Sequence, residues 1–107
     1  MGTKINDIIK NLLFTNSKLC DIFGEYARVI NSNINETHSS AYENKIHIYM
    51  DEIDSDIDEL RSRWDETCLI CSRNKFPIQN ILEEIINNLS LIETGIDIIH
   101  DNIQNHE

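Results

Sequence analysis

Apolar residues recur at alternating steps of four and three along the last third of the chain. The run consists of Ile78, Leu82, Ile85, Leu89, Ile92, Ile96, Ile99 and Ile103. This spacing is the heptad period of a helix that buries one narrow seam against other helices. It predicts a helix over about residues 77–104, because Pro77 is tolerated in a first helical turn and disfavours helix at the residue before it.

A similar period near the start of the chain predicts a helix over about residues 4–33. The seam residues are Ile5, Ile9, Leu12, Leu19, Phe23, Tyr26 and Ile30. The neighbouring rows are also apolar, with Ile8, Ile22 and Val29 on one side and Leu13, Cys20, Ala27 and Ile34 on the other. Such a wide stripe suits a helix with two neighbours. Asn16 takes the one seam position without an apolar side chain, and we expect it to pair with a polar group across the core, near Asp56 and Thr94.

A third seam predicts a helix over about residues 41–73. It consists of Ile46, Met50, Ile53, Ile57, Leu60, Trp64, Thr67 and Cys71. Residues 31–40 are rich in Asn and Ser, which favour loops because their side chains hydrogen-bond to the local backbone. Ser40 and Glu43 have the spacing of a capping box, which predicts that the helix starts after Ser40.

The three predicted helices have similar lengths and short connections. This combination predicts a single all-α domain over residues 1–107, an antiparallel up-down-up three-helix bundle with coiled-coil-like heptad seams. In an alternative arrangement, the helices form a hairpin or an open set that another chain completes, since heptad seams often pair between molecules. The pattern therefore leaves open whether the helices also mediate homo- or hetero-oligomerisation.

The formal net charge of -10, from 19 acidic and nine basic residues, narrows the range of partners. Phosphate backbones and anionic membranes attract clustered Lys and Arg, so we expect neither a nucleic acid nor a membrane as partner. No apolar stretch is long enough to predict a membrane span, and the N-terminal residues lack the apolar core of a secretory signal. We therefore expect an intracellular protein, cytoplasmic or nuclear, with one or more protein partners, for which a basic protein is one candidate.

An acidic segment within the second predicted helix is the best candidate for a binding surface. Its acids are Asp51, Glu52, Asp54, Asp56, Asp58 and Glu59. The segment lacks the glycine of a calcium-binding loop, and Ile53 and Ile57 keep the helical seam in phase through it. We expect a helix whose negative outer face either docks a basic partner or simply keeps the surface solvated. Ile98 lies off the seam of the last helix and is a further candidate contact residue.

Cys68 and Cys71 form the one motif that suggests redox or metal chemistry. A C-x-x-C pair serves as a redox dithiol or as half of a zinc site. In the predicted bundle Cys20 lies roughly 24 Å from Cys68, too far to share a metal ion. We therefore interpret the pair as small core residues one helical turn apart. The histidines lack metal-ligand spacing and no nucleophile or phosphate-loop motif occurs, so we expect no metal, no cofactor and no enzymatic activity.

These patterns favour a non-enzymatic helical protein–protein interaction module, a small subunit or adaptor of a multi-protein complex. Helix surfaces would supply its contacts. An alternative hypothesis is a small acidic effector or inhibitor, of the kind that viruses encode, which blocks a basic site on a target protein. A more distant alternative is a redox module that uses Cys68 and Cys71.

Overall fold

Helices make up almost all of the chain that the structure describes. The computed structural model describes residues 4–32 and 36–105, with side chains described at 4–31 and 40–102. Within these residues there are four α-helices and no strand, which confirms the predicted all-α fold. The helices are α1 (Ile5–Ser32), α2 (Glu36–Ser62), α3 (Trp64–Arg73) and α4 (Ile78–Asn105). None of these described helices has both the length and the apolar character that a membrane span requires.

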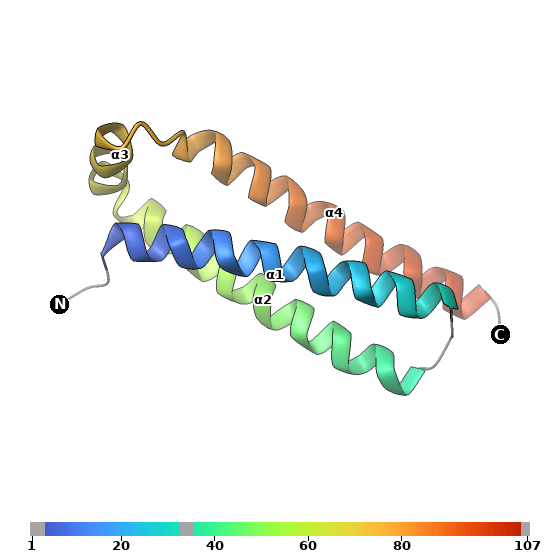
Figure 1. The fold of residues 1–107 in the computed structure, drawn as a ribbon. Coiled ribbons are helices and arrows are strands. Elements are labelled where there is room, and N and C mark those ends of the chain that lie inside the picture. Colours follow the sequence, from blue (N-terminus) through green and yellow to red (C-terminus); the bar gives the residue numbers. More distant parts are fainter. Residues whose placement is uncertain (1–3, 33–35, 106–107) are drawn as a thin grey trace.

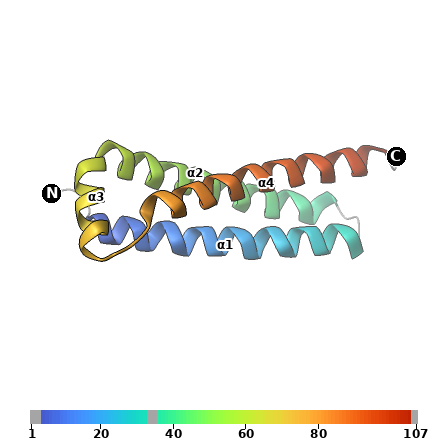
Figure 2. The same ribbon diagram turned by 90° about the horizontal axis from the view of Figure 1, so that it is seen from above.

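The long helices α1, α2 and α4 run along the molecule in alternating directions (Figure 1). The short helix α3 lies across the end at which α2 finishes and α4 begins (Figure 2). A helix of 28 residues such as α1 is about 42 Å long. The molecule is 54 Å long, so one long helix spans most of its length.

The prediction of one continuous helix over residues 41–73 is wrong, because the chain bends at Arg63. The backbone of Arg63 has φ -116° and ψ 39°, outside the helical range. A helix break deprives a carbonyl group of its usual amide partner. Here the buried Thr67 hydroxyl donates to the Leu60 carbonyl oxygen at 3.0 Å. This hydrogen bond satisfies the carbonyl at the bend.

The expected start of the second helix also needs correction. α2 begins at Glu36, so Ser40 lies inside the helix rather than at its start. Tyr42 stacks on Tyr26 of α1 with ring centroids 6.2 Å apart, and Glu43 accepts a hydrogen bond from Tyr26. These contacts hold the beginning of α2 against α1 and outweigh the weak loop preference of the local sequence.

Because α3 is a separate helix, the expected three-helix bundle is confirmed only in its helical character.

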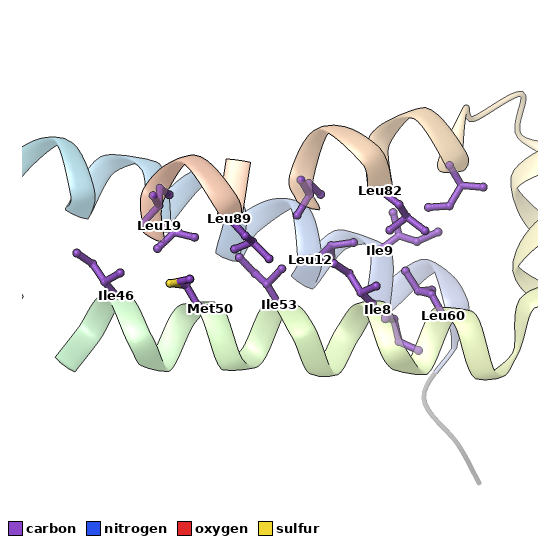
Figure 3. Close-up of a cluster of buried hydrophobic side chains, with 14 of the residues drawn as sticks. Ile8, Ile9, Leu12, Leu19, Ile46, Met50, Ile53, Leu60, Leu82 and Leu89 are labelled. Carbon is purple, nitrogen blue, oxygen red and sulfur yellow. The ribbon is translucent and has the colours of Figure 1, made fainter. Parts of the chain in front are cut away.

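Side chains from α1, α2 and α4 meet in one hydrophobic core along the molecule, as Figure 3 shows for Leu12, Ile53 and Leu89. The buried residues of α4 are Ile78, Leu82, Ile85, Leu89, Ile92 and Ile96, all from the predicted row. Each such side chain stabilises the fold by about 1.5–3 kcal/mol before the entropy of ordering is subtracted. Ile34 and Ile103, which belong to predicted apolar rows, lie outside the described side chains.

α4 contacts α1 through a polar pair and through a glycine. The Asn88 side-chain amide donates to Asn16 Oδ1 at 2.9 Å. Asn16 is therefore paired across the core, as predicted, but its partner is Asn88 of α4 rather than a group near Asp56 and Thr94. Farther along α4, Gly95 lies so close to Phe23 that an added Cβ would be 2.5 Å from the Phe23 ring. The absence of a side chain at Gly95 lets this ring pack against the backbone of α4.

The turn between α3 and α4 is a Schellman motif, which ends a helix with a residue in the left-handed conformation. Lys75 is that residue, with φ 55°. The Phe76 N–H donates to the Cys71 carbonyl oxygen at 2.8 Å, and the Lys75 N–H donates to the Ser72 carbonyl oxygen at 3.2 Å. The predicted helix end at this point and the position of Phe76 in the turn are confirmed.

Candidate functional site

A groove between α2 and α4 is the candidate binding site. On α2, Asp54, Asp58 and Arg61 follow one another at steps of four and three, so they share one helix face. The same spacing on α4 gives a row that consists of Gln79, Glu83, Ile86, Ser90 and Glu93. Each row lies beside the core row of its own helix. The two rows therefore form the edges of the space between α2 and α4.

Two adjoining hollows make up this groove. The first has a volume of about 440 Å³ and is lined by Arg61, Trp64, Gln79, Leu82, Glu83 and Ile86. The second has a volume of about 460 Å³ and is lined by Asp54, Ile57, Asp58, Arg61, Ile86, Leu89, Ser90 and Glu93. Because Arg61 and Ile86 line both hollows, the groove is continuous. Apolar side chains form its floor and charged side chains form its edges.

The groove has a negative net charge. The charged side chains among its described lining residues are acidic at Asp54, Asp58, Glu83 and Glu93 and basic at Arg61. Burial raises the pKa of Asp54, and the carboxylates of Asp51, Asp58 and Glu93 raise this pKa further. The ionised form of Asp54 is therefore disfavoured by its surroundings. A positive charge placed in the groove would relieve this repulsion.

The predicted acidic surface is divided among different faces of α2. Asp54 and Asp58 line the groove toward α4. Glu52 and Asp56 instead face α1, where the Asn11 side-chain amide donates to Glu52 at 3.0 Å and to Asp56 at 2.8 Å. Burial raises the pKa of Asp56, and the hydrogen bond from Asn11 opposes that effect. These two acids belong to the contact between α1 and α2.

The other predicted contact residues lie outside the groove. Glu59 pairs with Arg63 at 3.5 Å, and Arg63 also pairs with Glu66 at 3.0 Å, so Glu59 belongs to the bend between α2 and α3. Asp51 is exposed. Ile98 is 54% exposed on α4 and is not among the residues that line the groove. The structure thus brings Asp54 and Asp58 together and separates them from Ile98.

Several groove residues were not predicted from the sequence, namely Arg61, Trp64, Glu83, Ile86 and Glu93. The signal for the α4 members is a second helical row beside the core seam, which is visible in the spacing from Glu83 to Glu93. That spacing marks the flank of a helix. It does not tell which neighbouring helix the flank faces, because this depends on how the helices pack.

A polar cluster that was also missed joins α1, α2 and α4. The buried Tyr26 hydroxyl donates to Glu43, and His100 makes a hydrogen bond to the same carboxylate oxygen. Burial raises the pKa of Glu43, but the hydrogen bonds from Tyr26 and His100 and the positive charges of His100 and His47 lower its pKa below the ordinary value. Burial and the Glu43 carboxylate raise the pKa of Tyr26 far above its ordinary value. A tyrosine that stays protonated near neutral pH suits a structural network better than general-base chemistry.

Cys68 and Cys71 lie on α3, where Cys71 is buried and Cys68 is partly buried. Burial raises the pKa of Cys71, and the neighbouring Cys68 raises it further. A redox dithiol works through a thiolate that its surroundings stabilise, so these surroundings favour packing over redox chemistry. Among the described residues, no three His, Cys, Asp or Glu side chains are grouped so that they could hold a metal ion.

No protein-family model, no curated protein and no solved structure matches this chain.

Proposed function

We propose that the chain is a non-enzymatic helical protein–protein interaction module, a small subunit or adaptor of a multi-protein complex. The observation that carries this proposal is the groove between α2 and α4, with its apolar floor and acidic edges. Protein interfaces commonly combine an apolar centre with a polar rim. The groove has this arrangement on the surface of a single chain.

The apolar floor also supports the idea that another chain completes the helix packing. Trp64 and Ile86 line the groove and are only partly buried by this chain. A further helix laid along the groove would remove more of their apolar surface from water, which is favourable by about 25 cal/mol for each Å². The proposed partner therefore gains binding energy from side chains that the chain leaves partly uncovered.

Site-specific photo-crosslinking tests this proposal. A photoreactive amino acid would replace Ser90 in the groove or, as a matched control, Ser17, which is exposed on α1. We expect Ser90 but not Ser17 to crosslink to a defined protein in cells of the native source. That protein, once purified, should form a stoichiometric complex with the full chain in size-exclusion chromatography with light scattering, and Ile86→Ala should weaken the complex. Identical crosslinks from both positions, or no complex between the purified proteins, would contradict the proposal.

A second candidate function is an acidic effector or inhibitor that blocks a basic site on its target. The position of Asp54 and Asp58 at the edge of the groove favours it, because opposite charges accelerate association and orient the partner. The two candidates differ in the effect of binding. If the chain lowers the activity of the purified partner in proportion to complex formed, it is an inhibitor. If the activity of the partner is unchanged, or if the complex is more stable than the partner alone, the chain is a subunit or adaptor.

A further inference from the structure

We infer that the groove between α2 and α4 binds one amphipathic, basic α-helix of a partner protein. This inference rests on the proposed function and names the class of segment that fills the groove. Proteins recognise peptide segments by a few recurring modes, among them strand addition to a sheet edge and insertion of a helix into a groove. The described part of the chain contains no strand edge for strand addition, whereas an elongated apolar groove between two helices fits the insertion of a helix.

The groove has the length of a short helix. On α4 its lining runs from Gln79 to Glu93, which is about 21 Å at roughly 1.5 Å per residue. On the opposite edge the α2 lining runs from Asp54 to Arg61, which is about 10 Å by the same rule, and Trp64 of α3 extends this edge beyond the bend. A partner helix of about 14 residues, or four turns, would lie along both hollows.

The apolar floor sets the spacing of the partner's hydrophobic residues. Trp64, Leu82 and Ile86 line the first hollow, and Ile57 and Leu89 line the second. Apolar residues at i, i+3 or i+4, and i+7 lie on one face of a helix and would reach both hollows in succession. The partner helix therefore needs one apolar stripe about two turns long, with the rest of its surface polar.

The charges at the edges of the groove select a basic partner. Asp54 and Asp58 lie on one edge, and Glu83 and Glu93 lie on the other. Lys or Arg residues that flank the apolar stripe of the partner would face these four carboxylates. Arg61 lies where the hollows join, so we expect the cationic residues of the partner near the two ends of the groove. A second copy of this chain is disfavoured as the occupant, because each copy has a net charge of -10.

Trp64 allows a direct binding experiment, because it is the one tryptophan in the sequence and it lines the groove. The full chain would be titrated with a tryptophan-free peptide of about 15 residues, with Leu at helical spacing and Lys on both flanks. We expect a saturable change in Trp64 emission and weaker binding at high salt. A peptide of the same composition in shuffled order, and a peptide with Glu in place of Lys, should bind at least about tenfold more weakly.

Matched charge variants test whether the groove itself is responsible. The double variant Asp58→Asn with Glu93→Gln removes two carboxylates from opposite edges of the groove. The control variant Asp21→Asn with Glu25→Gln removes two exposed carboxylates from α1. We expect the groove variant to weaken peptide binding about tenfold and the control to change it less than about twofold. Circular dichroism would verify that both variants remain helical.

Three results would overturn the inference. Equal binding of the shuffled peptide would show attraction to net charge rather than to an amphipathic helix. Equal losses in the groove and control variants would place binding outside the groove. A chain that forms a dimer in light scattering, and loses it on Ile86→Ala, would show that a second copy fills the groove.

Failure of this inference differs from failure of the proposed function. If Ser90 crosslinks to a protein that forms a purified complex, but the basic amphipathic peptide does not bind, the inference is wrong and the proposed function stands. If no protein partner crosslinks specifically from Ser90 and the purified complex does not form, the proposed function is wrong as well.

Discussion

Two helical glycines of this chain have opposite surroundings. A Cβ built at Gly24 meets no atom within 4 Å, whereas a Cβ at Gly95 would lie 2.5 Å from the Phe23 ring. Glycine weakens a helix by about 1 kcal/mol relative to alanine at either position. At Gly95 the contact with Phe23 offsets that cost. At Gly24 no neighbouring group would obstruct a methyl group.

We predict that Gly24→Ala raises the free energy of unfolding by about 1 kcal/mol, because the helix gains propensity without a clash. Gly95→Ala should lower the free energy of unfolding by about 1 kcal/mol, since the new methyl group displaces Phe23. Urea denaturation of both variants measures this difference. In a Phe23→Leu background, Gly95→Ala should become less harmful or stabilising. Equal stabilisation by the two alanines in the wild-type background would contradict the prediction.

The hydrogen bonds at Glu43 make stability depend on pH at both ends of the scale. The folded state lowers the pKa of Glu43 below 4.5, so its contribution to stability is present above pH 4.5 and is lost as the pH falls through the lowered pKa. The folded state raises the pKa of Tyr26 above 10.0, so its contribution is present below pH 10.0 and is lost as the pH rises further.

We predict that Glu43→Gln lowers the free energy of unfolding by about 1.5 kcal/mol at pH 7, because a charged hydrogen-bond acceptor is lost. The difference between wild type and variant should shrink as the pH falls below 4.5. Urea denaturation at a series of pH values measures it. Glu25→Gln on the exposed face of α1 is the control and should leave stability nearly unchanged throughout. A difference that is independent of pH would show that Glu43 does not act through its charge.

At the scale of elements, hydrogen bonds between neighbouring residues set where α3 begins and ends. The Thr67 hydroxyl satisfies the Leu60 carbonyl oxygen at the bend before α3. The Schellman motif around Lys75 ends α3 and directs the chain into α4. The left-handed conformation costs a residue with a Cβ about 1 kcal/mol, whereas glycine adopts it freely.

We therefore predict that Lys75→Gly raises the free energy of unfolding by about 1 kcal/mol. Arg73→Gly is the matched control, because Arg73 lies in the last turn of α3 with helical geometry. That substitution should lower the free energy of unfolding by up to about 1 kcal/mol. Thermal denaturation followed by circular dichroism measures both. Destabilisation by Lys75→Gly would show that the Lys75 side chain contributes more than its backbone conformation costs.

At the scale of the whole molecule, negative charge gathers on the side where α2 and α4 face each other. The pKa of Asp54 is raised by its burial and then by Asp51, Asp58 and Glu93. Asp54 has a higher pKa in the folded chain than in the unfolded chain. Its contribution to stability is therefore present at pH values below the pKa of the unfolded chain, and it is lost as the pH rises through the pKa of the folded chain. At neutral pH the ionised Asp54 therefore lowers stability.

We predict that Asp54→Asn raises the melting temperature at pH 7 and low salt, and that high salt reduces the gain by screening the repulsion. Asp7→Asn is the control, because Asp7 lies in the first turn of α1, where a negative charge is favourable. It should lower the melting temperature slightly. The same Asp54→Asn variant should bind the basic peptide more weakly than the wild type. The Asp54 carboxylate would then favour peptide binding and lower the stability of the free chain. Equal effects of both substitutions on the melting temperature would contradict this account.

The apolar rows on α1 and α4 could be predicted because burial follows helical spacing. Leu12, Leu82 and Leu89 are all buried where the period places them. The bend at Arg63 could not be predicted in this way, since Trp64, Thr67 and Cys71 continue the same period past it. Of the candidate contact residues, the sequence identified Asp54 and Asp58 but not the residues of α4 that lie opposite them.

The sequence by itself determined that the chain is helical and that most residues of the apolar rows are buried, because both follow from the local alternation of apolar and polar residues along each helix. Only the tertiary structure decided that Asn16 pairs with Asn88, that Phe23 packs on Gly95, and that Asp54 and Glu93 line one groove. Each of these contacts joins residues distant in the chain. Their meeting depends on the rotation and separation of packed helices, which the period of one helix does not specify.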